Sequence, residues 1–143
     1  MNHREFAALA ALLACILCGG ASAAEIKGAE ILNHPCGKVA VKSMGLLSQG
    51  KIEEANKLTT KAMQERWAAM PAKDKQMMAG LAKEMSPSEA KFTAMVKADG
   101  VLVVDDKTGK LTVTQKTQDA NGSSTSTTRT EFAVNGGECL INR

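Results

Sequence analysis

The sequence has no tyrosine, one tryptophan and two histidines, so side chains that enzymes commonly use are scarce. Acid–base and nucleophilic catalysis draw largely on histidine, cysteine, tyrosine, lysine and carboxylates. Beyond residue 23 the only histidine is His34. The sequence shows no Ser/His/Asp arrangement, no phosphate-binding loop and no motif that implies a cofactor. This composition favours a non-catalytic protein.

An excess of charge of one sign is also missing. The formal net charge is +3 at pH 7 and is spread along the chain. Nucleic-acid-binding proteins usually concentrate basic residues in a patch, often with aromatic side chains between them. No such patch is present, so we expect no nucleic-acid partner.

The chain lacks an apolar run long enough to cross a membrane, which takes roughly 20 residues. The longest run covers residues 6–18, after Arg4, and Gly19-Gly20 ends it. Ala21-Ser22-Ala23 then supplies the small residues that signal peptidase reads. The sequence therefore predicts a signal peptide over residues 1–23, cleaved near Ala23-Ala24. It also predicts a periplasmic or secreted protein with no stable membrane span.

The segment that ends in Cys15 loosely resembles a lipoprotein signal, in which the cysteine is acylated. The chain stays apolar after Cys15, however, and the small-residue cleavage site lies further on. We therefore favour cleavage before Ala24 over a lipid anchor at Cys15.

Cleavage would remove Cys15 and Cys18 and leave Cys36 and Cys139. In an oxidising compartment two remaining cysteines most simply form one disulfide. Two free thiols or a soft-metal pair are the alternatives. A Cys36–Cys139 bridge would tie the first element of the domain to the last.

After the signal peptide, residues 24–38 are interpreted as a leader and a turn, and residues 39–143 as a single domain. Apolar side chains recur at helical spacing between about 38 and 98, with one helix ending near Gly50 and another starting at Lys51 and running to Met63. A third helix follows Pro71.

Residues 87–98 fit two assignments. Ser86-Pro87-Ser88-Glu89 has the form of a capping box, which would start a helix, but an alternating strand pattern fits as well. Both assignments stay open there.

From about 100 to 142 the chain turns to β-branched, alternating segments separated by turns. The turns fall at residues 105–109, 119–122 and 135–137. This pattern predicts an antiparallel meander of three to four strands. Helices followed by strands indicate an α+β fold, with N-terminal helices packed on a curved C-terminal sheet.

The last hairpin indicates where Cys139 points. A two-residue turn at either Asn135-Gly136 or Gly136-Gly137 places Phe132, Val134, Cys139 and Ile141 on one face, because side chains alternate along a strand. A three-residue turn would move Cys139 and Ile141 to the other face. The apolar pattern therefore predicts an even loop and a core-facing Cys139.

Methionine is abundant, and thioether sulfur is a soft ligand for Cu(I). The candidate ligands are five methionine sulfurs and one imidazole, from Met63, Met70, Met77, Met78, Met85 and His34. Pro71 interrupts the stripe, and methionine is also a flexible filler of protein cores. We therefore favour core packing for the methionines and keep a metal site as the alternative.

Three carboxylates are candidates for acid–base work. Asp105 and Asp106 lie in a predicted turn, whose geometry explains them. Alternation points Glu131 outward from its strand. The sequence therefore assigns no catalytic residue.

Four segments between Val39 and Ile141 carry a family resemblance: Gly50-Lys51-Ile52-Glu53-Glu54-Ala55, Met70-Pro71, Gly100-Val101-Leu102 and the ending from Phe132 to Ile141. In these the chain resembles small exported proteins of the nuclear transport factor 2-like (cystatin-like) superfamily. The resemblance implies a cone of curved sheet closed on one side by helices, sometimes with a pocket. Members include enzymes, ligand binders and scaffolds, so fold does not settle function. The pocket residues of the enzymatic members have no match here.

These observations together predict an exported, non-catalytic binding or interaction protein of the cell envelope. Its partner would be another envelope protein, or a small apolar ligand held in a small cavity. Two alternatives stay open: a Met-rich periplasmic Cu(I)-binding protein, and a small cavity enzyme of the same fold.

Overall fold

Strands from both ends of the domain form one antiparallel sheet in the computed structural model, which describes residues 22–143. The predicted signal peptide, apart from its last two residues, lies outside the described residues. The five strands follow one another in the order β1-β2-β3-β4-β5. They are β1 (Ala24–Lys27), β2 (Gly100–Val104), β3 (Thr108–Asp119), β4 (Gly122–Asn135) and β5 (Glu138–Ile141).

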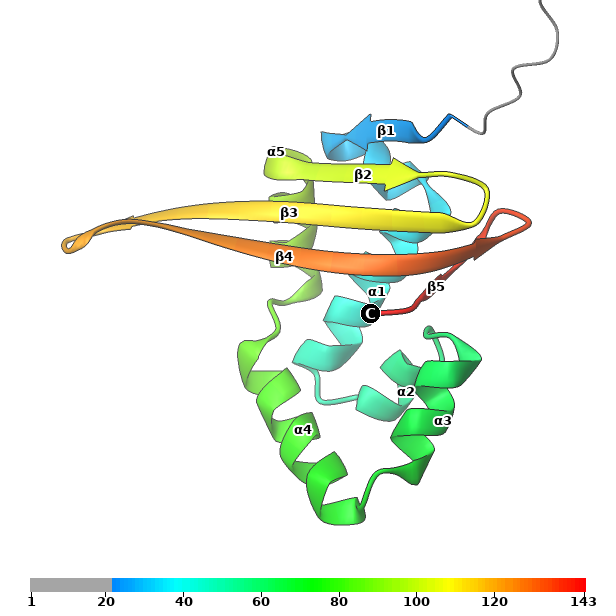
Figure 1. Cartoon of the computed structure of the whole chain (residues 1–143). Helices are drawn as coiled ribbons and strands as arrows, with labels where there is room; N and C mark the ends of the chain where they lie inside the picture. The colour runs from blue at the N-terminus through cyan, green and yellow to red at the C-terminus, as the bar shows by residue number, and fades with distance from the viewer. Residues whose placement is uncertain (1–21) are drawn as a thin grey trace, which may run out of the picture.

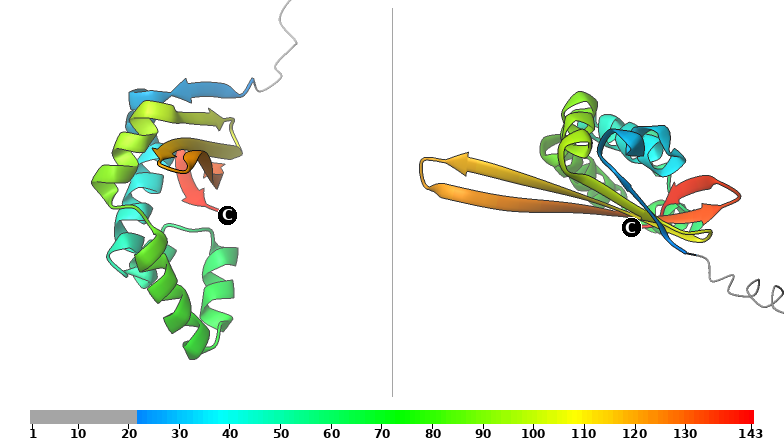
Figure 2. Two further views of the ribbon diagram at one scale, coloured as in Figure 1. Left: turned by 90° about the vertical axis from the view of Figure 1, so that its left-hand side faces the viewer. Right: turned by 90° about the horizontal axis from the view of Figure 1, so that it is seen from above.

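The helices lie on one side of this sheet, so the predicted α+β fold is confirmed (Figures 1 and 2). They are the 3-10 helix η1 (Gly28–Asn33) and the α-helices α1 (Pro35–Ser48), α2 (Ile52–Asn56), α3 (Lys61–Ala69), α4 (Ala72–Met85) and α5 (Glu89–Asp99). Residues 87–98, left open between helix and strand, belong mostly to α5. The cap of α5 is Ser88, whose hydroxyl accepts the Lys91 N–H at 3.2 Å, rather than Ser86.

The interpretation of residues 24–38 as a leader and turn is wrong. Ala24–Lys27 pairs with β2 along its whole length, which gives the sheet one strand more than predicted. Ile31 in η1 is fully buried. Four residues carry too little periodicity to predict a strand, and only the long-range pairing with β2 supplies their hydrogen bonds.

The predicted helix from Lys51 to Met63 is divided in two. α2 ends at Asn56, and Thr59 forms a parallel bridge with Ile141. The Ile141 N–H donates to the Leu58 carbonyl at 2.9 Å, and the Thr60 N–H donates to the Ile141 carbonyl at 2.8 Å. Strand β5 thus takes the backbone groups that a continuous helix would have used, a tertiary contact that local periodicity does not reveal.

The core lies between the sheet and a layer made of η1, α1 and α5. Phe92 and Val96 of α5 and Ile31 of η1 meet the inward side chains of the central strands. Those strand residues are Leu102, Val104, Leu111, Val113 and Phe132. The covered face of the sheet is therefore filled with side chains, while none of the helices in residues 22–143 lies on the opposite face (Figure 2).

The last hairpin confirms the predicted register. Asn135 pairs with Glu138 and Val134 with Cys139, so the two-residue turn is Gly136-Gly137. Both glycines have positive φ, at 58° and 85°, a conformation that favours glycine. Cys139 is buried and bonded to Cys36 of α1, so the predicted disulfide is confirmed.

Two parts of the molecule extend away from this core (Figure 1). One is the far end of the β3–β4 hairpin, and the other is the pair of helices α3 and α4, neither of which contains a buried residue. Across residues 22–143 we find no helix whose length and apolar character would let it cross a membrane.

Candidate functional site

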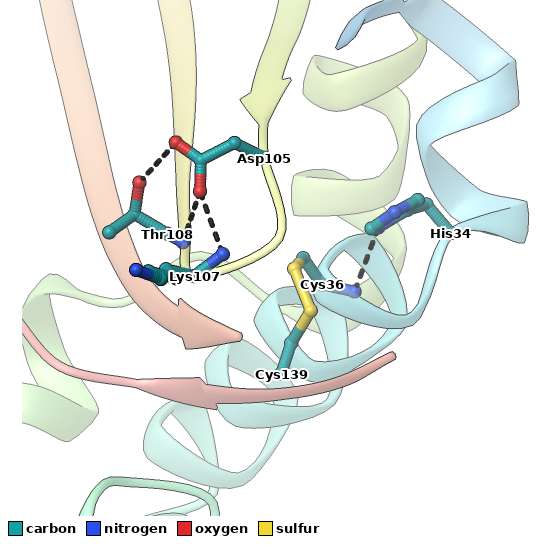
Figure 3. Close-up of a disulfide and its surroundings, with 6 residues drawn as sticks. All are labelled: His34, Cys36, Asp105, Lys107, Thr108 and Cys139. Carbon is teal, nitrogen blue, oxygen red and sulfur yellow. Dashed lines mark hydrogen bonds between the residues drawn. A yellow bond between two sulfur atoms is a disulfide. The ribbon is translucent and has the colours of Figure 1, made fainter. Parts of the chain in front are cut away.

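The disulfide corner brings together His34, Cys36 and Cys139 (Figure 3). The imidazole nitrogens and the two sulfurs offer atoms within 4.8 Å of one another. His34 is the N-cap of α1, and its Nδ1 accepts the Cys36 N–H at 3.2 Å. The Pro35 ring follows at the first helical position, where a missing N–H costs nothing.

This geometry gives His34 a structural role. Capping satisfies one of the N–H groups that a helix start leaves without an intrahelical partner. Soft metals bind thiolates, and a disulfide offers none. His34 is half-buried. The signal that could have revealed the cap is its place directly before a helix-starting proline.

Asp105 shapes the β2–β3 turn (Figure 3). One carboxylate oxygen accepts the N–H groups of Lys107 at 2.8 Å and Thr108 at 2.7 Å, and the other accepts the Thr108 hydroxyl at 2.9 Å. These bonds, led by the two backbone N–H groups, hold the pKa of Asp105 below its ordinary value of 3.8. The predicted turn role is confirmed. Glu131 also lies as predicted, because it pairs with Lys110 on the uncovered face.

Substitution of Asp105 by alanine is expected to destabilise the protein at neutral pH and not at low pH. A carboxylate with a depressed pKa stabilises the fold above its unfolded-state pKa of 3.8, and this contribution is lost as the pH falls through the lower folded-state value. The melting temperatures of wild type and D105A should therefore differ at pH 7 and converge as the pH falls through the lowered folded-state pKa of Asp105. D106A, which leaves the Asp105 bonds in place, is the control. A D105A difference that stays constant from pH 7 into the acid range where the carboxylate is protonated would contradict this assignment.

Two open hollows lie on the surface of the described residues. One, of about 450 Å³, lies beside the disulfide corner and includes His34, Asp106 and Val134 in its lining. The other, of about 270 Å³, lies between α5 and β3 and includes Met95 and Gln115 in its lining. Both open to solvent and lie at the edges of the filled layer, because Met95 and Val104, which line them, also belong to the core or pack against it. Recognition at the surface is therefore better supported than recognition in a cavity.

The largest exposed apolar side chains gather on one helix, α4. They are Met77 (56% exposed), Met78 (46%), Leu81 (45%) and Met85 (79%), and we refer to them as the α4 surface. The apolar residues of α4 that are partly covered are small, Ala79 and Ala82. Since α4 packs against α1 without burying a single residue, its large side chains remain available for contact.

The expected core role of the methionine stripe is therefore wrong for Met77, Met78 and Met85. Their spacing correctly indicated a common helix face, but spacing does not say whether a face turns inward. Met63 and Met70 are partly buried. Leu81, which belongs to the same surface, was not among the candidate site residues.

The structure separates His34 from the α4 methionines with which the copper alternative combines it. His34 stands at the N-terminus of α1, whereas Lys83 of α4 lies beside Gly50, just beyond the other end of α1. A helix of this length separates its ends by roughly 20 Å. The Cu(I) site with Met63, Met70, Met77, Met78, Met85 and His34 stays a prediction, which titration with Cu(I) under reducing conditions would test.

Comparison with known proteins adds no relative, so the resemblance to the nuclear transport factor 2-like superfamily also stays a prediction. No family model, no curated protein and no solved structure matches the chain.

Proposed function

We propose that this chain is a non-catalytic interaction protein of the cell envelope, and that it binds an amphipathic helix of another protein through the α4 surface. The observation that carries the proposal is the exposure of Met77, Met78, Leu81 and Met85 on a helix with no buried residue. Contiguous exposed apolar side chains commonly mark interaction sites.

The spacing and chemistry of these residues fit such a partner. Met78, Leu81 and Met85 stand at positions i, i+3 and i+7, the pattern by which helices recognise one another across an apolar contact. Methionine adapts its shape to a partner because its side chain is unbranched and flexible. Covering these side chains would gain about 25 cal/mol for each Å² of apolar surface removed from water.

Export is the second part of the proposal. It is supported by the predicted signal peptide and by the Cys36–Cys139 disulfide, since stable disulfides are typical of oxidising compartments. The filled sheet face supports a protein partner over a small apolar ligand.

Site-specific photo-crosslinking in the producing cell would test the contact. We would place a photoreactive phenylalanine at Met78 and, as a control, at the exposed Gln76, which lies about 200° away around the helix. One defined protein adduct, formed from Met78 and not from Gln76, is expected. Lipid adducts alone, equal yields from both positions or no adduct would each refute the proposal.

Charge placed on the α4 surface should weaken binding and spare the fold. Against the crosslinked partner segment, M78K and L81K are each expected to weaken affinity by roughly tenfold or more, because each leaves a charge in a desolvated contact. Their unfolding free energies should stay within about 0.5 kcal/mol of wild type, since neither residue is buried. Q76K adds the same charge elsewhere and should bind normally. Calorimetric titration and urea unfolding measure the two quantities.

A further inference from the structure

The distal part of the β3–β4 hairpin is a two-stranded ribbon with both long edges uncovered. Pairing between β2 and β3 stops at Val113, and pairing between β4 and β5 starts at Phe132. The ribbon between them, residues 114–129, extends beyond the helices, and we refer to it as the arm (Figures 1 and 2). Most of its side chains are exposed on both faces.

The hydrogen bonds at the base of β4 show which backbone groups face its outer edge. The Val134 N–H donates toward β3, to the Lys107 carbonyl at 2.8 Å. At Glu131 the N–H donates to the Arg143 carbonyl at 2.9 Å and the carbonyl accepts the Asn142 N–H at 2.8 Å, both on the side away from β3. The backbone N–H and C=O groups of successive residues point to alternate sides of a strand. The N–H and C=O groups of four arm residues therefore point outward: Ser123, Thr125, Thr127 and Arg129.

These outward groups have no strand beside them among residues 22–143, because the strand neighbours of β4 are β3 and β5. Proteins usually protect such edges with charged side chains, proline or a bulge. Residues 120–128 contain no charged residue and no proline. The β3–β4 register runs without a bulge from Thr108↔Ala133 to Asp119↔Gly122. The opposite edge of the arm differs, because β3 carries Lys116 at its centre.

An unprotected edge of this kind is a template for strand addition. A two-stranded ribbon is only marginally stable in water, whereas further strands supply the missing hydrogen bonds. Threonine and serine fill the arm and are compatible with strands on a solvated surface. The arm is thus built to accept another strand along β4.

We infer that the β4 edge of the arm pairs antiparallel with the same edge of a second copy of this chain. The result is a two-fold dimer with a continuous β3-β4-β4-β3 sheet. The edge is self-complementary: a register centred on Ser126 sets Thr125 against the partner's Thr127 and Ser123 against the partner's Arg129. No like charges face each other in this register, and cross-strand threonine pairs are favourable. Because the arm projects beyond the helices, the two helical layers lie at opposite ends of the dimer.

A matched pair of proline variants tests the edge. Thr125 and Lys116 face each other across the hairpin, and each points its N–H away from the other strand. Proline at either position therefore spares the β3–β4 hydrogen bonds, but only T125P removes a donor from the β4 edge. A dimer loses two such bonds, one per copy, so T125P is expected to raise the dimer dissociation constant roughly 10- to 100-fold. K116P should dimerise as wild type does.

Sedimentation equilibrium of the disulfide-bonded protein, lacking residues 1–23, measures these constants. A wild-type protein that stays monomeric to millimolar concentration overturns the inference, as does equal weakening by T125P and K116P. M78K should leave the dimer dissociation constant unchanged. If M78K were monomeric instead, the dimer contact would belong to the α4 surface and not to the arm.

Hydrogen exchange of the wild-type protein provides a test that does not depend on a variant. The amides of Ser123, Thr125 and Thr127 should become protected as the protein concentration rises. The outward amides of β3, those of Thr114, Lys116 and Gln118, should exchange at the same rate throughout. Concentration-independent exchange on the β4 edge would contradict the inference.

Discussion

Reduction of the Cys36–Cys139 disulfide is expected to lower the free energy of unfolding by about 4 kcal/mol. The two cysteines are 103 residues apart, so the bond closes a loop that includes most of the domain. In the chain-entropy account a loop of this length restricts the unfolded chain by ~4–5 kcal/mol, and residual structure in the unfolded chain lowers the value. The bond also joins α1, the first α-helix, directly to β5, the last strand of the sheet.

Urea unfolding with and without a phosphine reductant measures this effect. The double variant C36A/C139A should match the reduced protein within about 1 kcal/mol and should not respond to the reductant. Intact-mass measurement confirms that the wild-type protein starts oxidised. Equal unfolding midpoints for the oxidised and reduced wild-type protein would contradict a stabilising role for the bond.

Truncation of Phe92 to alanine is expected to cost about 3–5 kcal/mol of unfolding free energy. Its ring is 1% exposed and belongs to the core cluster between α5 and the sheet. Alanine would remove the buried surface and leave a cavity where the neighbouring side chains cannot close in fully. The loss is comparable with the whole stability of many domains, so F92A should unfold at a much lower urea concentration.

Met85 provides the matched control, because it is also a large apolar side chain on a helix but is 79% exposed. M85A should change the unfolding free energy by less than about 0.5 kcal/mol. The contrast measures directly which helix builds the core and which presents a surface. Similar losses for F92A and M85A would mean that α4 packs more deeply than the structure places it.

The sequence is most informative where a feature depends on neighbouring residues. The Gly136-Gly137 turn and the alternation of Val134, Cys139 and Ile141 were sufficient to predict that Cys139 faces the core. The Asp105 turn could be predicted for the same reason, because its hydrogen bonds reach no further than Thr108. The disulfide then followed from the predicted compartment and from the number of cysteines that remain.

Features that depend on distant segments could not be predicted. Strand β1 exists because β2, more than seventy residues later, lies beside it. The helix predicted from Lys51 is interrupted because Ile141 binds the backbone of Leu58 and Thr60. Each of these contacts joins residues far apart in the chain, and hydrophobic periodicity contains no information about them.

The candidate site shows the same division. The sequence alone determined that Met78, Leu81 and Met85 share one face of a helix, because a period of 3.6 residues is a property of the backbone. Only the tertiary structure decided that this face turns to solvent while Phe92 and Val96 of α5 turn to the sheet. Both helices carry apolar residues at helical spacing, and the difference arises because α5 packs on the sheet, whereas α4 packs against α1 and leaves its large apolar side chains uncovered.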